Sequence, residues 1–170
     1  MSPDSNKVRP TSDRIKETLF NILQKYNTDG EIIDLFAGSG ALGIEALSRG
    51  AESVIFVDNN PDSCRLIRAN LDKLKITTKT SIWQVDYKYA IKKASTEGRI
   101  IDIILADPPY NSMYEQEILN TVVEFGVLHE GGILVIEHDS GLEFGHDSLD
   151  RDSRRCGHTT LSFFKKRSHK

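Results

Sequence analysis

Short apolar runs alternate with segments of helical periodicity along the first 140 residues, and this alternation constrains the fold more than any other feature. The apolar runs span residues 31–36, 53–58, 80–85, 101–106 and 133–137. Helical patterns lie at about residues 12–26, 41–49, 61–74, 87–95 and 113–125. Strands that alternate with helices in this way form a parallel sheet with helices on both faces. After these, Gly157 separates residues 151–156 from the alternating segment Thr160–Phe164, which predicts a closing hairpin, and residues 141–149 predict a loop or short helix.

The first apolar run leads into a glycine-rich turn. Residues 32–43 read IIDLFAGSGALG, a strand that passes through Gly38 and Gly40 into a helix. Glycine lets the backbone bend tightly and lets a ligand approach without meeting a Cβ atom. With Gly43 these residues match G-x-G-x-x-G, so a dinucleotide-binding Rossmann fold has to be weighed. Asp34 argues against a phosphate at this turn, because a carboxylate and a phosphate carry charge of the same sign. The same carboxylate suits a cofactor with a positively charged amino-acid end.

Acidic residues end or follow the other predicted strands. Asp58 ends the second strand, 20 residues after Gly38, and a carboxylate at this spacing meets ribose hydroxyls in nucleoside-binding folds. Asp86 follows the third strand and Asp107 follows the fourth. The carboxyl ends of parallel strands open on one edge of a sheet, where ligands bind. We therefore expect these acids and Asp34 to converge, although each one alone could be a helix cap or a strand-end residue.

The tetrapeptide Asp107-Pro108-Pro109-Tyr110 follows the fourth strand directly. Proline fixes φ and removes backbone donors, which leaves a rigid turn with free carbonyl groups. A carboxylate, a backbone acceptor and an aromatic ring then meet at the edge of the sheet. The two acceptors match the two N–H bonds of an exocyclic NH2 group, and the ring can stack on a planar base. The alternative is a turn that merely ends the strand.

Composition bounds the class of protein. At 170 residues, with 28% charged and 38% hydrophobic residues, the chain has the size and composition of one soluble globular domain. No apolar run approaches the roughly 20 residues of a membrane span, and no signal peptide opens the chain. The two cysteines, Cys64 and Cys156, make no disulfide framework and match no metal-ligand spacing. We expect a cytoplasmic protein without a metal ion.

Charge is distributed unevenly along the chain. The net charge is −3, but residues 151–170 carry +6 and the other 150 residues carry −9. A basic C-terminal edge can contact phosphates. A solvated strand pair with a charged tail explains the same excess, so charge alone does not predict RNA binding.

Three motifs in order resemble class I S-adenosylmethionine-dependent N-methyltransferases: the 34–40 loop, the acid after the next strand, and DPPY. Residues 9–23, RPTSDRIKETLFNIL, resemble more closely the opening segment of RsmD-type 16S rRNA guanine-N2 methyltransferases, and residues 38–51 are similarly typical of that group. The resemblance covers residues 8–166. It implies a Rossmann-like class I methyltransferase fold with a mostly parallel seven-stranded sheet, helices on both faces and a C-terminal antiparallel hairpin. We expect a single domain over residues 1–170, with residues 1–11 as an N-terminal arm or lid.

The resemblance also implies roles for the cofactor site. Asp34 and the 36–40 loop would hold the methionine part of S-adenosylmethionine, Asp58 would accept hydrogen bonds from the ribose, and Asp86 lies where these enzymes bind the adenine amino group. Residues before the first helix lie where a lid would close over the methionine carboxylate. The predicted cofactor-binding residues are Arg9, Thr11, Asp34, Phe36, Ala37, Gly38, Ser39, Gly40, Asp58, Asn59, Asp86 and Asp107.

The implied reaction is methyl transfer to the exocyclic N2 amine of a guanine in 16S rRNA, within the small ribosomal subunit or its assembly intermediate. Acceptors on Asp107 and on the carbonyl of Pro108 would hold the amine, and Tyr110 would stack on the base. The predicted catalytic residues are Asp107, Pro108, Pro109 and Tyr110, with no metal, no membrane and no obligate protein partner expected. The predicted RNA contacts are Arg154, Arg155, Lys165 and Lys166.

Other functions have to be weighed against this one. DPPY also occurs in DNA adenine and cytosine N-methyltransferases, which usually carry a target-recognition insert for which 170 residues leave little room. A nucleotide-binding oxidoreductase and a cofactor-binding module without transfer activity are the remaining alternatives. RsmD-type proteins normally carry a basic, glycine-containing segment before the RPT motif, whereas eight residues precede Arg9 here. Cofactor binding with poor modification of naked RNA is therefore expected. Cys156 stands where the family commonly has an aromatic residue.

Overall fold

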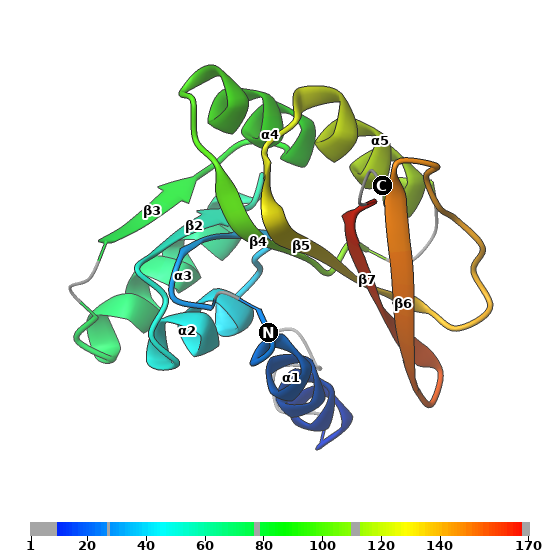
Figure 1. Ribbon diagram of the computed structural model, residues 1–170. Coiled ribbons are helices and arrows are strands. Elements are labelled where there is room, and N and C mark those ends of the chain that lie inside the picture. The colour runs from blue at the N-terminus through cyan, green and yellow to red at the C-terminus, as the bar shows by residue number, and fades with distance from the viewer. Residues whose placement is uncertain (1–9, 27, 77–78, 110–112, 168–170) are drawn as a thin grey trace.

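The computed structural model describes residues 10–26, 28–76, 79–109 and 113–167, and these residues form one seven-stranded sheet (Figure 1). The strands are β1 (Glu31–Leu35), β2 (Ser53–Val57), β3 (Lys79–Trp83), β4 (Ile101–Ala106), β5 (Leu128–Asp139), β6 (Leu149–Cys156) and β7 (Thr159–Lys166). Their order across the sheet is β3-β2-β1-β4-β5-β7-β6. Neighbours from β3 to β5 pair in parallel, whereas β7 is antiparallel to both β5 and β6. The predicted mostly parallel sheet with an antiparallel C-terminal hairpin is confirmed.

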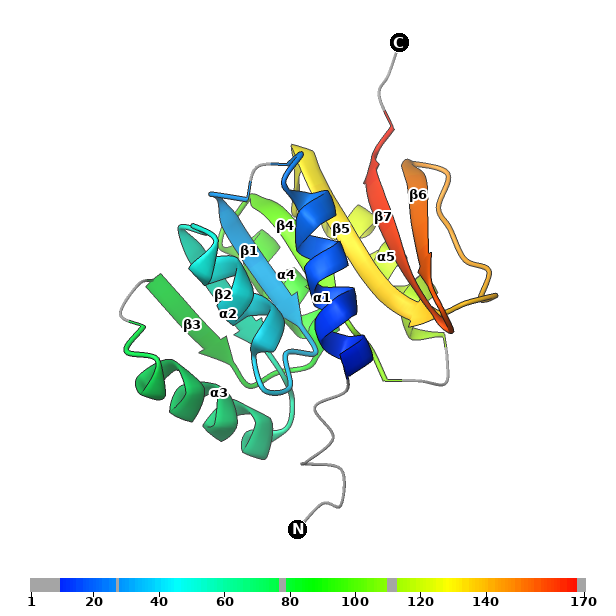
Figure 2. The ribbon, with the colours of Figure 1, turned by 90° about the horizontal axis from the view of Figure 1, so that it is seen from below.

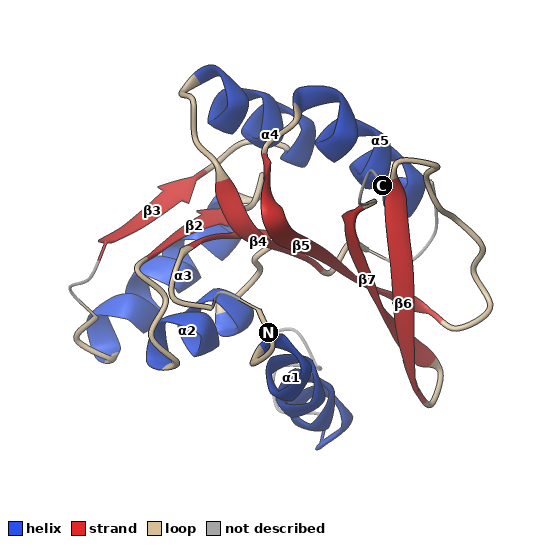
Figure 3. Ribbon diagram, viewed as in Figure 1, coloured by secondary structure: helices blue, strands red, loops and turns tan. Residues whose placement is uncertain are grey.

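Helices cover both faces of the sheet, as Figure 3 shows. They are α1 (Pro10–Leu23), α2 (Ala41–Ser48), α3 (Pro61–Lys73), α4 (Tyr87–Thr96) and α5 (Tyr114–Phe125). Successive strand residues point to opposite faces, so two apolar cores form. One lies beneath α1, α2 and α3 and includes Phe56 and Leu105; the other lies beneath α4 and α5 and includes Ile104. Within the described ranges, no helix is long and apolar enough to cross a membrane.

The carboxyl ends of β1 to β5 share one edge of the sheet, the carboxyl edge. Figure 2 shows the N-terminal end of α1 at this edge. Because β7 runs antiparallel to β5, Thr159 pairs with Asp139, and the turn at Gly157 lies at the same edge. β7 ends at the opposite edge, the amino edge, where Lys166 pairs with Leu149. The tip of the β6–β7 hairpin is therefore a neighbour of the strand ends.

Two of the element boundaries that differ from the expectation have a clear physical cause. α1 begins at Pro10 rather than near residue 12, and proline is favoured in the first helical turn because its missing N–H has no helical partner there. The prediction that Thr11 precedes the helix is therefore wrong. β5 begins at Leu128 rather than at residue 133. A Cβ atom at Gly132 would lie 2.8 Å from the carbonyl oxygen of Asp102, so this glycine lets two strands approach closely and does not mark the start of one.

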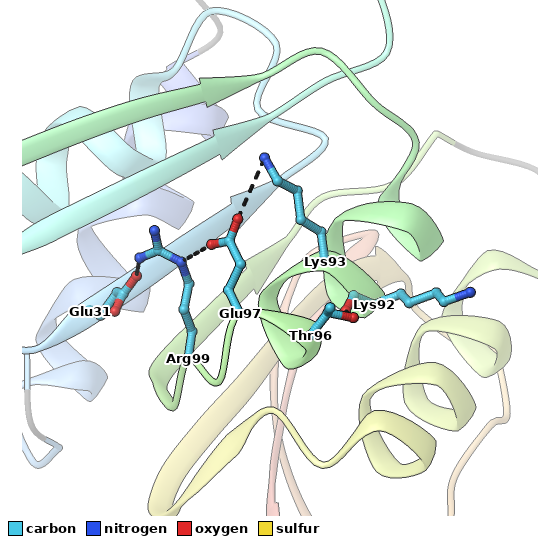
Figure 4. A network of polar contacts seen from close by, with 6 residues as sticks. All are labelled: Glu31, Lys92, Lys93, Thr96, Glu97 and Arg99. Atoms are coloured by element: carbon cyan, nitrogen blue, oxygen red, sulfur yellow. Dashed lines mark hydrogen bonds and ion pairs between the residues drawn. The ribbon is translucent and has the colours of Figure 1, made fainter.

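A charged network ties the amino edge together (Figure 4). Arg99, which precedes β4, contacts Glu31 at 2.5 Å and Glu97 at 2.6 Å. Lys93 of α4 lies 3.8 Å from Glu97. Both cations also lie over the ring of Trp83, with Lys93 Nζ at 4.1 Å and the Arg99 guanidinium at 5.7 Å from its centroid. The network joins the end of α4 to the start of β1, at the edge opposite the acidic strand ends.

Candidate active site

The loop from residue 36 to residue 40 makes a tight turn between β1 and α2. Phe36, Gly38 and Gly40 have φ angles of 56°, 58° and 85°, a region that residues other than glycine rarely adopt. The N–H of Gly40 donates to the carbonyl of Ala37 at 2.8 Å, which closes the turn. A Cβ atom at Gly38 would have no neighbour within 4 Å. The loop therefore leaves open space above Gly38, while Ala37 is buried and Ser39 is exposed.

Asp58 follows β2 and supports this loop from the side. Its Oδ2 atom accepts from the N–H of Gly38 at 2.9 Å, and its Oδ1 atom accepts from the N–H of Asn60 at 2.9 Å. A carboxylate oxygen has a second lone pair, so Asp58 can also accept hydrogen bonds from a ligand. The neighbouring Asn59 is exposed.

Asp34 lies in β1 beneath the first turn of α2. Only 1% of its surface is exposed, and its Oδ2 atom accepts from the N–H of Gly43 at 3.0 Å. Burial raises the pKa of Asp34 to about 7; the bond from Gly43 lowers this pKa, and the nearby carboxylates of Asp107 and Asp58 raise it. A positively charged ligand at this edge would favour the ionised form of Asp34.

A pocket of about 90 Å³ opens at the carboxyl edge between the ends of β1, β2 and β3 and the Pro108-Pro109 turn. One side is aromatic, with the rings of Phe36 and Tyr87 5.2 Å apart. The other side is polar and includes Asp86, which also caps α4 by accepting from the N–H of Tyr89 at 2.9 Å. An apolar wall with a few fixed polar groups is the usual build of a small-molecule site. The lining residues that matter here are Phe36, Asp58, Asn59, Asp86, Tyr87 and Pro109.

Asp107 extends from the end of β4, next to β5. The strand register pairs Ala106 with Ile136, so the next residues, Asp107 and Glu137, lie side by side, and their carboxyl groups are hydrogen bonded. Asp107 itself is exposed, but the surrounding protein atoms partly desolvate the carboxyl group, and this raises its pKa. Pro108 is buried and Pro109 is exposed. The described residues contain no group of three or more His, Cys, Asp or Glu side chains arranged to hold a metal ion.

The chain matches the family model described as Conserved hypothetical protein 95 over residues 1–165. The chain belongs to this family. Its relatives in the family include a protein of Bacillus subtilis (strain 168), YlbH, named as a candidate rRNA methyltransferase. The two are 36% identical over 94% of this chain and 88% of the relative. The predicted membership of the RsmD-type family is confirmed.

A second relative in the family is the ribosomal RNA small subunit methyltransferase D of Escherichia coli (strain K12), 34% identical over 81% of this chain and 67% of that protein. Among solved structures, a candidate methyltransferase of Escherichia coli, yhhF, superposes with a TM-score of 0.81. It is 26% identical, and the match covers 95% of this chain and 89% of that one. The fold predicted from the sequence is thus shared with this solved structure.

The structure brings some of the predicted site residues together and places others apart. Asp34, Asp58, Asp86 and Asp107 meet at the carboxyl edge. Arg9 and Tyr110 lie outside the described residues, and Thr11 belongs to the first turn of α1. The four basic residues predicted to contact RNA separate: Arg154 and Arg155 pair with Leu161 and Thr160 near the hairpin tip, whereas Lys165 and Lys166 lie at the amino edge.

Two features of the site were not predicted from the sequence: the position of Glu137 beside Asp107, and the aromatic side of the pocket. Glu137 ends the fifth predicted strand, so the rule that strand-end acids converge would have included it. The rings of Tyr87 and Tyr114 pack against Phe36 at 5.2 and 5.7 Å. Helical periodicity assigns Tyr87 and Tyr114 to helix starts, and nothing in the sequence relates these starts to the 36–40 loop.

Proposed function

We propose that the protein transfers a methyl group from S-adenosylmethionine to the exocyclic N2 amine of a guanine in 16S rRNA. The substrate is the small ribosomal subunit or its assembly intermediate, in the cytoplasm, and residues 1–170 act as one catalytic domain. The observation that carries the proposal is the position of Asp107 and Pro108 at the strand end beside the pocket that Phe36, Asp58 and Pro109 line. Hydrogen-bond acceptors for an amine thus lie next to a pocket with aromatic and acidic lining residues.

The residues of the pocket fit S-adenosylmethionine. Asp58 accepts from the ribose hydroxyls with Asn59 beside the adenosine, and Asp86 accepts from the adenine amino group. The 36–40 loop holds the methionine part above Gly38, where a Cβ atom would meet no neighbour within 4 Å. Arg9 and Thr11 act as the lid over the methionine carboxylate.

The charge of the site supports the same cofactor. Asp34 lies near the carboxylates of Asp58 and Asp107, so three carboxyl groups favour a ligand that carries positive charge. S-adenosylmethionine supplies a methyl carbon on a positively charged sulfur, and the bonding electrons stay on that sulfur when the methyl group leaves. A phosphate-bearing dinucleotide would meet the same carboxyl groups with charge of the same sign.

The protein's own contribution is to hold the amine. The lone pair of an exocyclic guanine amine is delocalised into the ring, so the amine is a poor nucleophile. Acceptors at Asp107 and at the carbonyl of Pro108 hold its two N–H bonds and favour a tetrahedral nitrogen, while Tyr110 stacks on the base. The nitrogen gives its lone pair to the methyl carbon and then loses one proton to solvent. Positioning of this kind can lower the activation barrier by on the order of 7–11 kcal/mol.

RNA recognition is assigned to the hairpin tip. Arg154 and Arg155 lie at the carboxyl edge, on the same side of the molecule as Asp107. Relatives named rRNA methyltransferases, at 36% and 34% identity, support RNA over DNA as the substrate. Both arginines are exposed, as a phosphate contact requires.

Transfer of labelled methyl groups tests the proposal. Wild-type protein with S-adenosylmethionine is expected to label small ribosomal subunits from cells that lack their RsmD-type enzyme, to label naked 16S rRNA poorly, and to leave duplex DNA unlabelled. The cofactor class is tested separately: S-adenosylhomocysteine should stabilise the protein against heat and NAD should not. Labelled DNA would favour a DNA methyltransferase, and cofactor binding without any label would favour a silent module.

Asp107→Ala is the matched variant for this assay. Loss of the acceptor is expected to lower kcat at least 100-fold, within the range known for a group that acts on the reacting centre. The dissociation constant of S-adenosylmethionine, measured by calorimetry, should change less than about threefold, since the pocket residues stay in place. Equal turnover in Asp107→Ala and wild type would remove Asp107 from the mechanism.

A further inference from the structure

The carboxyl groups of Asp107 and Glu137 form a pair where the target amine would bind. Only Asp107 has a proposed role, as an acceptor for the amine. Asp107 and Glu137 follow register-paired residues of β4 and β5, and their side chains are hydrogen bonded. Two ionised carboxylates have only acceptors. A hydrogen bond between them therefore requires one proton held by the pair.

The environment decides which residue holds that proton. Burial, the charge of Asp107 and the hydrogen bond to Asp107 raise the pKa of Glu137 to about 8. Desolvation raises the pKa of Asp107, whereas the hydrogen bond from Glu137 lowers it. At neutral pH the proton therefore lies on Glu137, which donates, and Asp107 keeps the negative charge and accepts. The two groups titrate as a coupled pair.

Residues on the neighbouring strands and on α1 do not take over the role of the Glu137 proton as a donor to Asp107. From β1, Asp34 adds a further carboxyl group near Asp107. From β7, the residue in register with Glu137 is the buried Leu161, which has no polar atom in its side chain. The N-terminal end of α1 lies at this edge, and its first turns include Asp13 and Arg14, which are both exposed. Arg14 faces the hairpin tip, where it lines a groove with Cys156 and Gly157.

We propose that Glu137 is a positioning residue of the methyl transfer, whose protonated carboxyl group donates to Asp107 and holds the Asp107 carboxylate as an acceptor for the target amine. This inference rests on the proposed function. Of the four lone pairs on the two Asp107 oxygens, the bond from Glu137 occupies one and leaves the others for the amine. When Glu137 ionises, the two carboxylates repel one another, the hydrogen bond is lost, and the orientation of Asp107 is no longer fixed.

Two substitutions separate this role from packing. Glu137→Gln keeps an N–H donor toward Asp107 but cannot ionise, whereas Glu137→Leu removes the donor and keeps a side chain of similar size. We expect Glu137→Gln to retain kcat at pH 7 within about threefold. Glu137→Leu should lose roughly 10- to 100-fold in kcat, the size of effect that a lost hydrogen bond to a charged group produces. The dissociation constant of S-adenosylmethionine should stay the same in both variants.

The pH profile is the readout that a merely structural role would not change. In the wild type, kcat/KM is expected to fall above about pH 8 as Glu137 loses its proton. Glu137→Gln should lack this fall, and since both proteins meet the same substrate, titration of the RNA bases cancels in the comparison. An alkaline fall of the same size in Glu137→Gln, or full kcat in Glu137→Leu, would overturn the proposal.

Carbon NMR of labelled side-chain carboxyl groups in the protein without cofactor gives an independent test. We expect a glutamate signal with a midpoint near pH 8 that disappears in Glu137→Gln. In Asp107→Asn, which serves if Glu137→Gln does not fold, the midpoint of Glu137 should be lower than in the wild type, because the charge of Asp107 is gone. A Glu137 that titrates with ordinary glutamates would overturn the inference. Absence of methyl transfer by the wild type would instead overturn the proposed function, and the NMR result would still describe the pair.

Discussion

At the scale of one residue, Asp34 shows how burial and neighbouring carboxylates set the charge of a side chain at the carboxyl edge. It is 1% exposed, it accepts one backbone N–H, and it has the carboxylates of Asp58 and Asp107 as neighbours. Burial and like charge both favour the neutral form, so the pKa is raised to about 7. The native state therefore binds a proton at pH values where the unfolded chain has released it. Stability that this proton provides is present at low pH and is lost as the pH rises from about 4 to about 7.

The substitution Asp34→Asn tests this linkage. Asparagine keeps an oxygen that can accept from the N–H of Gly43 but has no charge to bury. Between pH 5 and pH 8 the free energy of unfolding of Asp34→Asn should rise relative to the wild type by about 2–3 kcal/mol, at about 1.4 kcal/mol per pKa unit. Urea unfolding at several pH values measures the difference. Asp147→Asn, at an exposed residue beside Lys166 and Arg167 on the far side of the molecule, is the surface control and should change the free energy of unfolding by less than about 0.5 kcal/mol.

Some contacts among the site residues could be predicted from the sequence and others could not. Asp34, Asp58 and Asp107 were predictable as neighbours because each lies at the end of a strand, and parallel strands end at one edge. The hydrogen bond from Gly43 to Asp34 was not, because it depends on how deeply α2 packs over β1. Glu137 was missed although the same edge rule applies to it, since its partner is set by the register between β4 and β5 rather than by sequence spacing.

At the scale of elements, the third glycine of the G-x-G-x-x-G match is explained by packing. A Cβ atom at Gly43 would lie 2.4 Å from the Phe56 ring and 2.9 Å from a Val54 methyl group. Phe56 is fully buried, so its ring has little room to move. Gly43 thus allows α2 to pack directly on β2, which places the 36–40 loop and its open space at the strand ends.

Gly43→Ala is expected to destabilise the protein by about 1–3 kcal/mol, the usual cost of forcing extra atoms into a packed core. Thermal and urea unfolding measure the loss. Gly145→Ala is the matched control, because a Cβ atom there meets nothing within 4 Å and the φ angle of Gly145 is not positive. If both substitutions had the same small effect, close packing of α2 on β2 would not explain the glycine.

Most elements were predictable from hydrophobic periodicity, and the boundaries that were wrong have physical causes. The fifth apolar run predicts a strand that begins at residue 133, but β5 starts at Leu128. The pairing of β4 with β5 is irregular between Ile101 and Ile103, and Gly132 lies against the backbone of Asp102 there. Close backbone contact across a sheet leaves no mark in the periodicity of one strand.

At the scale of the whole molecule, the two edges of the sheet have different chemistry. The carboxyl edge gathers acidic strand ends, the pocket and the hairpin tip with Arg154. The amino edge holds the Arg99 network and the Lys166–Glu130 ion pair at 3.1 Å. The sequence gives the net charge of the last 20 residues but not its division between the edges. That division follows from the antiparallel direction of β7, along which Leu161 and Lys166 are separated by about 17 Å at roughly 3.4 Å per residue.

This division predicts which basic residues contact RNA. The double substitution Arg154→Ala and Arg155→Ala, at the two exposed residues near the hairpin tip, should weaken binding to small ribosomal subunits several-fold. It should also reduce the slope of log affinity against log salt by about one to two, because each lost phosphate contact reduces the number of released counterions by about one. Filter binding at several salt concentrations measures both quantities. Lys165→Ala with Lys166→Ala removes the same charge from the amino edge and should leave both unchanged; the opposite pattern would place the RNA at that edge.

The proposed function depends on which atom receives the methyl group, and nucleoside analysis of the labelled product identifies that atom. Small ribosomal subunits lacking the modification are incubated with the protein and S-adenosylmethionine, and the 16S rRNA is digested and analysed by mass spectrometry. We expect N2-methylguanosine in the wild-type reaction and none with Asp107→Ala. A methyl group on adenine or cytosine, or on another atom of guanine, would contradict the arrangement of Asp107 and Pro108 around an exocyclic guanine amine.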